Sequence, residues 1–224
     1  MATIQDRRHR RLDELSVTAS RAFVESGLHG FEAEVVVALD VSPRMAPLYA
    51  QGLVQGLATA LLALAMRFDD DGTVPVWCFD GEARHLGEIK RQGYANWVRA
   101  HVPTPSEPDP AAPEPPAAAR FAPMIDAIGR RYFPREWAAK GTAHVVGDKL
   151  KRQVIAYPGP LEPRAIPVFV IIVTSGDCAD ALETTRLLRR ASHLPIFWQF
   201  AGLDPTRGDP NAPRFHFLRG VDKL

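Results

Sequence analysis

The chain has 224 residues, of which 46% are hydrophobic, which is enough to build one sizeable domain with a buried core. Its 27 Lys and Arg residues nearly balance its 26 Asp and Glu residues, and a net charge of +1 excludes recruitment of nucleic acid or an acidic membrane by a global field. Two cysteines are too few for a disulfide framework, so we expect reduced thiols. A charged N-terminus and the lack of an apolar run of ~20 residues predict a soluble, cytoplasmic protein without a membrane span.

The N-terminal part of the chain alternates helical and strand patterns. Residues 1–30 are predicted to form a helical extension, because apolar residues recur at helical spacing up to Phe23, before two glycines. The next segment, AEVVVAL, is typical of a buried parallel strand, and Asp40 ends it. A long helix is predicted over residues 47–68, and the strand VPVWCFD follows. The next segment, ARHLGEI, fits either an edge strand or an irregular turn.

Two segments in the second half are expected to lie outside the main sheet. Residues 101–119 are rich in Pro, Ala and acidic side chains, which predicts an exposed loop of polyproline character. This loop is either a passive insertion or a docking segment for a proline-reading partner. Residues 138–165 are interpreted as a hairpin insertion around a Gly-Asp turn.

The remaining segments complete an alternating order of helices and strands. FAPMIDAIGRRYF predicts a helix, IPVFVIIVTSGD a second buried strand, residues 180–192 a helix, and LPIFWQFAGL and RFHFL two further strands. This order predicts one α/β domain over residues 31–224, with a doubly wound, mainly parallel sheet flanked by helices. Ligands of such sheets bind at the carboxyl ends of the strands, where Asp40, Ser42 and residues 174–177 fall.

Several long blocks of the sequence resemble one known family. These blocks are VALDVSPRM, LYAQGLVQGLATALLALAMRFDDDG, VWCFD, FAPMIDAI, PVFVIIVTSGD and SHLPIFWQFAGL, in that order, with a final FHFL. They resemble von Willebrand factor A (VWA) domains, especially the bacterial type found with tellurium-resistance and stress-response gene clusters. The resemblance covers about residues 34–221 and implies a VWA fold.

The resemblance also implies a metal-ion-dependent adhesion site that binds Mg2+ through oxygen ligands, which hard dications prefer. In the family, an Asp-x-Ser-x-Ser motif, a Thr and an Asp supply these ligands. Here Asp40 and Ser42 match the motif, but Arg44 replaces its second serine. Ala119 stands in place of the threonine and Ser175 in place of the acid. The resemblance therefore predicts a degenerate site.

Arg44 decides what such a site can hold, because its cation is permanent. At ~4 Å and an effective dielectric of about 20, two unit charges interact by roughly 4 kcal/mol, and a dication doubles this repulsion. We therefore expect no metal; if one binds, Asp40 and Ser42 are its ligands. In one interpretation Arg44 pairs with Asp40 and binds an Asp or Glu of a partner; in the other it points to solvent. Asp177 either supplies a displaced carboxylate or caps the next helix.

The function expected is a non-catalytic protein-interaction module in which Arg44 replaces the cation. One alternative is a Mg-dependent protein-binding VWA domain, and another is a regulatory subunit of a stress-response or AAA+ ATPase-linked complex. An enzyme is not expected, because the sequence shows no paired nucleophile and base and no phosphate-binding loop. No cofactor is expected.

Overall fold

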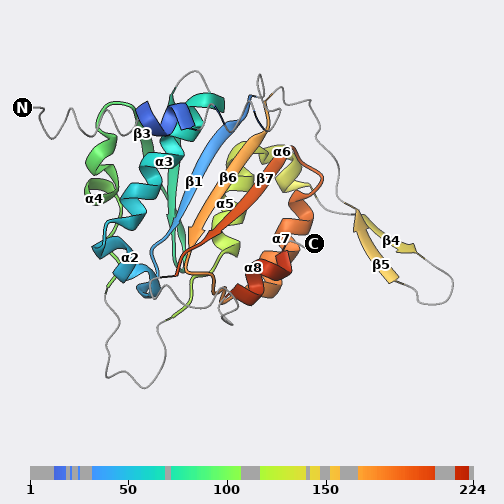
Figure 1. Ribbon diagram of the computed structural model, residues 1–224. Helices are drawn as coiled ribbons and strands as arrows, with labels where there is room; N and C mark the ends of the chain where they lie inside the picture. The colour runs from blue at the N-terminus through green and yellow to red at the C-terminus, as the bar shows by residue number, and fades with distance from the viewer. Residues whose placement is uncertain are drawn as a thin grey trace, which may run out of the picture.

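The computed structural model describes residues 13–18, 21, 25, 32–68, 72–106, 117–139, 142–146, 152–156, 166–204 and 215–221. Their centre is a five-stranded sheet with the order β3-β2-β1-β6-β7 (Figure 1). The strands are β1 (Glu34–Asp40), β2 (Thr73–Phe79), β3 (Ala83–Lys90), β6 (Val168–Thr174) and β7 (Ile196–Gly202). All neighbours pair in parallel except β2 and β3, which pair antiparallel. The mainly parallel α/β sheet is thus confirmed, and ARHLGEI is an edge strand.

Helices cover both faces of the sheet (Figure 1). On one face lie α2 (Ala46–Ala50), α3 (Leu53–Phe68) and α4 (Trp97–His101); on the other lie α5 (Ala122–Tyr132), α6 (Pro134–Ala138), α7 (Ala181–Ala191) and α8 (His216–Val221). Short 3-10 turns, η1 (Pro43–Met45) and η2 (Tyr94–Asn96), precede α2 and α4. Successive side chains of β1 enter opposite cores, because side chains alternate along a strand: Val35 and Val37 pack with α3, and Val36 and Ala38 with α5.

The predicted long helix is divided. Gln51 and Gly52 separate α2 from α3, and Gly52 adopts a positive φ of 71°, which favours glycine. Apolar periodicity continues through this break, so the pattern did not reveal it. Among the described helices, none alone is long and apolar enough to cross a membrane. One pair, Pro43–Ala50 and Leu53–Met66, has sufficient length and apolar composition when taken together, but the two helices are bent by 79° at the break between them.

The prediction that RFHFL forms a last strand is wrong. Its residues His216 onward form helix α8. Phe217 packs edge-on against the rings of Phe121 and Phe200, with centroids 5.7 and 6.4 Å apart, and Leu218 and Val221 join the same core. A short apolar run fits either a strand or a helix, and packing against the core decided for the helix.

The predicted Pro-rich loop begins later than expected. His101 is the last residue of α4, and Val102 is buried. Residues 107–116 lie outside the described residues. At its other end, Ala119 is buried.

The two remaining predicted segments are described in part. Residues 13–18 are helical and Leu15 packs on the core, while most of the predicted extension 1–30 lies outside the described residues. Within residues 138–165, β4 (Thr142–Val146) pairs antiparallel with β5 (Arg152–Ala156) as a separate two-stranded sheet, and the turn between them lies outside the described residues.

The contact between α5 and α6 depends on a glycine. The indole of Trp137 is buried against α5, and its Nε1 donates to Asp126 Oδ1 at 2.8 Å. The Arg190 guanidinium lies over the Trp137 ring, 5.2 Å from its centre. A Cβ at Gly129 would lie 2.5 Å from ring carbons of Trp137, so only glycine allows this approach.

We expect Gly129→Ala to lower the free energy of unfolding by about 1–3 kcal/mol, because the new methyl group forces the fixed indole out of place. Urea unfolding followed by circular dichroism measures this. Gly56→Ala is the matched control: Gly56 is also helical, but no atom lies within 4 Å of its added Cβ. It should leave stability unchanged or raise it by about 0.5–1 kcal/mol. Equal losses in both variants would contradict the proposed contact.

Candidate functional site at the carboxyl end of the sheet

The candidate site is formed where the neighbouring parallel strands β1 and β6 end. Leu39 pairs with Val173, so Asp40 and Thr174 leave the sheet side by side. Pro43 then starts η1, which carries Arg44, and Gly176 turns the chain after β6 with a φ of 100°. The sheet register thus brings the two predicted site segments together.

Asp40 is the anchor of the site and is fully buried. Its Oδ1 accepts a hydrogen bond from the Ser42 N–H at 2.8 Å. Its Oδ2 accepts one from the Thr174 hydroxyl at 2.8 Å and another from the Ser175 N–H at 3.4 Å. The Tyr49 hydroxyl donates to the Asp40 carbonyl at 3.0 Å, which ties α2 to the end of β1. Each oxygen of the carboxylate thus accepts at least one hydrogen bond from the chain itself.

Burial raises the pKa of the Asp40 carboxyl above its ordinary value of 3.8. Removing the carboxylate from water disfavours its charged form, and the hydrogen bonds from Ser42, Thr174 and Ser175 oppose this effect without overcoming it. The pKa of the Tyr49 phenol is also raised, by burial and by the Asp40 charge, so the hydroxyl keeps its proton and remains a hydrogen-bond donor.

Arg44 engages Asp177 rather than the predicted partner Asp40. Arg44 Nη1 lies 2.5 Å from Asp177 Oδ2, and the two side chains are 30% and 26% exposed. The oxygens of Asp40 are occupied by Ser42, Thr174 and Ser175 instead. The expected Arg44–Asp40 pair is therefore replaced by an ion pair that joins the β1–α2 loop to the β6–α7 loop.

One serine hydroxyl beside the anchor lacks a bonding partner. Ser42 and Ser175 are both buried, and the Ser175 Oγ has no hydrogen-bond partner within the part of the chain that the structure describes, whereas the Ser42 hydroxyl interacts with the Asp40 carboxylate and lowers its pKa. The backbone N–H groups of both serines bind Asp40. A buried hydroxyl without a partner carries a desolvation cost, so the Ser175 oxygen is available to a small polar ligand or water.

Ala119 lies next to the same loop, but its side chain is only a methyl group. It forms a β-bridge with Cys178, and its carbonyl accepts from the Ala179 N–H at 2.9 Å. Burial raises the pKa of the Cys178 thiol to about 11, which keeps it protonated and unsuited to nucleophilic attack near neutral pH. Ala119 therefore contacts the loop of the site through its backbone, but its side chain has no atom that could bind a ligand ion.

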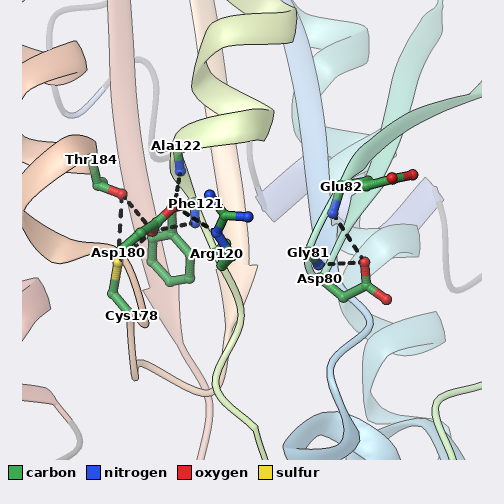
Figure 2. Close-up of polar contacts among 9 residues, drawn as sticks. All are labelled: Asp80, Gly81, Glu82, Arg120, Phe121, Ala122, Cys178, Asp180 and Thr184. Carbon is green, nitrogen blue, oxygen red and sulfur yellow. Dashed lines mark hydrogen bonds and ion pairs between the residues drawn. The ribbon is translucent and has the colours of Figure 1, made fainter.

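Asp180 is the residue that the sequence reasoning missed. Figure 2 shows its carboxylate between α5 and α7. It accepts from the backbone N–H groups of Phe121 and Ala122 at 2.9 and 3.2 Å and from the Thr184 hydroxyl at 2.9 Å. Asp180 is also the N-cap residue of α7, a role the sequence analysis considered for Asp177. Its position before a helical run was a usable signal, but its bonds to α5 were not visible in sequence.

A second turn lies beside this network. Figure 2 places Asp80 after β2, where its Oδ1 accepts from the Gly81 and Glu82 N–H groups. Its carbonyl accepts from the Arg120 N–H at 2.6 Å. Arg120 Nε also lies 3.6 Å from Asp180 Oδ2. Arg120, just before α5, is therefore held by Asp80 through its backbone N–H and by Asp180 through its side chain.

The residue types at two positions do not fit the magnesium site that the family resemblance implies. In the sequence, Arg44 stands where the resemblance places a hydroxyl ligand and Ala119 stands where it places a threonine, so neither side chain offers an oxygen. In the structure the Arg44 guanidinium lies against Asp177. Asp40, Ser42 and Ser175 keep their oxygens buried at this edge.

Asp40 should make the stability of the protein fall as pH rises. Above about pH 3.9 the unfolded chain loses this proton while the folded state keeps it up to the raised pKa, so the folded state binds more protons in that interval. We expect the free energy of unfolding of the wild type, relative to that of Asp40→Asn, to decrease as the pH rises through this interval. Urea unfolding at a series of pH values measures the difference.

Asp126 is the control for this measurement. Partial burial alone would raise the pKa of Asp126, but hydrogen bonds from Arg130 and Trp137 outweigh it and lower the pKa. Relative to Asp126→Asn, the wild type should therefore gain stability as pH rises through the acid range. The same slope for both variants would contradict the assignment to Asp40.

Comparison with known proteins agrees with the α/β fold. The family described as "vWA found in TerF C terminus" matches residues 32–224. The uncharacterized protein YcbR of Bacillus subtilis is 27% identical over 192 residues, and the match spans 86% of this chain and 63% of that protein. A solved structure of proximal thread matrix protein 1 from the mussel byssus aligns with a TM-score of 0.39 and 10% identity over 76% of this chain and 39% of that one, too distant to support an argument. The chain belongs to the TerF-like vWA family.

Proposed function

We propose that the chain is a non-catalytic protein-interaction module that binds an acidic side chain of its partner through Arg44 and without a metal ion. VWA domains commonly mediate protein interactions, and the family match supports that general role here. The single observation that carries the finer proposal is the Arg44–Asp177 ion pair at the carboxyl edge of the sheet.

The ion pair supports the proposal through its position and exposure. In an adhesion-type site, a partner carboxylate completes the coordination of a bound dication. Here a guanidinium, 30% exposed, lies at the same edge and already binds a carboxylate. Guanidinium groups bind carboxylates with two parallel hydrogen bonds and need no metal for it. Arg44 can therefore supply the positive charge for which the family uses an ion.

The setting of the module is part of the same proposal. We place it in the bacterial cytoplasm, in a stress-response context such as the tellurium-resistance clusters that the family resemblance suggests. The chain spans 63% of the length of its Bacillus relative, so the activity and partners of a whole protein of that kind are not carried over to this chain.

Calorimetric titration with Mg2+ or Mn2+ should show no specific binding to the wild-type protein, because Arg44 repels a dication. The combined substitutions Arg44→Ser, Ala119→Thr and Ser175→Asp restore the ligand types of the family and should create metal binding. A specific wild-type signal of millimolar or tighter affinity that Asp40→Ala abolishes would disprove metal independence. Failure of the triple variant to bind metal would show that the site is wrongly aligned.

Partner capture from an extract of the source cells should be unaffected by chelator and lost in Arg44→Ser. Lys90→Ser is the matched control, because Lys90 forms an exposed ion pair with Glu88 at the other end of the sheet. It removes the same charge away from the site. Capture that requires added Mg2+, or that survives Arg44→Ser, argues against Arg44 as the contact. Mass spectrometry of the bound fraction provides the readout.

A further inference from the structure

The Asp177 carboxylate binds the Arg44 guanidinium, the group to which the proposed function has a partner's carboxylate bind. Arg44 Nη1 binds Asp177 Oδ2 at 2.5 Å, and the two residues are separated by 133 positions in the chain. Both side chains are partly exposed, whereas Asp40 beside them is fully buried. The exposed edge therefore carries an ion pair that solvent, and a partner, can reach.

The loop around Asp177 is fixed on both sides. Before it, the Ser175 N–H binds Asp40 and the Gly176 N–H binds the Thr174 hydroxyl at 3.1 Å. After it, Cys178 bridges to Ala119 and the Ala179 N–H binds the Ala119 carbonyl. Because the backbone is held at both ends, the Asp177 side chain can leave Arg44 by a change of rotamer without unfolding the loop.

The partial exposure of the pair allows exchange. Fully exposed ion pairs contribute little net stability, since water and salt screen them and the side chains lose freedom in forming them. A buried pair resists replacement, because separating it leaves an uncompensated charge. At 30% and 26% exposure, the Arg44–Asp177 pair lies between these two limits, so water can reach either group when the pair separates.

We propose that Asp177 is an internal carboxylate ligand of Arg44 that a partner's Asp or Glu side chain displaces. This inference rests on the proposed function, because it concerns the same guanidinium. It adds regulation: the free protein shields its own recognition group, so stray carboxylates bind poorly. A true partner supplies further contacts that compensate for the loss of Asp177.

The test uses N-acetyl-aspartate amide as the carboxylate probe and the neutral N-acetyl-asparagine amide as its control, with binding followed by NMR chemical-shift titration. Asp177→Ala should bind the acidic probe about two- to five-fold tighter than the wild type, a range set by the strength of exposed ion pairs. Asp177→Asn, which keeps the side-chain shape, should change affinity in the same direction. Asp177→Glu keeps the competing carboxylate and should stay near the wild type.

Two matched variants separate the inference from the proposed function. Glu88→Ala also deletes a carboxylate from a surface ion pair, with Lys90, and should leave affinity unchanged. Arg44→Gln should abolish binding of the acidic probe. If the wild type and Asp177→Ala bind equally while Arg44→Gln does not bind, the internal ligand is disproved and the Arg44 site stands. If Asp177→Ala, shown to be folded, does not bind the probe at all, both proposals fail.

Discussion

The carboxylate of Asp40 is the interaction on which the carboxyl edge of this protein depends. It is fully buried at the end of a central strand, and its oxygens collect hydrogen bonds from Ser42, Thr174 and Ser175. Ser42 lies in the loop after β1, and Thr174 and Ser175 lie where β6 passes into its loop. A buried carboxylate is costly unless its oxygens are satisfied, so these loops are constrained to the positions that satisfy it. The raised pKa of Asp40 shows that the burial cost is offset only in part.

A second carboxylate, Asp180, organises the neighbouring helices by the same principle. It binds the first N–H groups of α5 while standing at the start of α7 (Figure 2). Free N–H groups at a helix start attract negative charge. One side chain thereby fixes the relative position of two helices on one face of the sheet, and with them the loop that carries Asp177.

The Arg44–Asp177 ion pair joins the loops that these two carboxylates hold, and it is partly exposed. The edge thus combines a buried carboxylate, Asp40, with a partly exposed guanidinium, Arg44. Under the proposed function, this guanidinium supplies the positive charge that an adhesion-type site takes from an ion. The buried Ser175 hydroxyl has no partner among the described residues.

The sequence by itself determined the central strands, because long β-branched and apolar runs have few alternatives to a buried parallel sheet. It also determined that Asp40, Ser42 and Ser175 lie at the carboxyl edge, since each directly follows such a run. Tertiary structure decided what these local patterns do not encode. Arg44 binds Asp177 rather than Asp40, and Asp180 binds α5, because loop path and side-chain direction choose partners far apart in the chain. The final apolar run became α8 rather than a strand, because a core of aromatic rings was available to cover it.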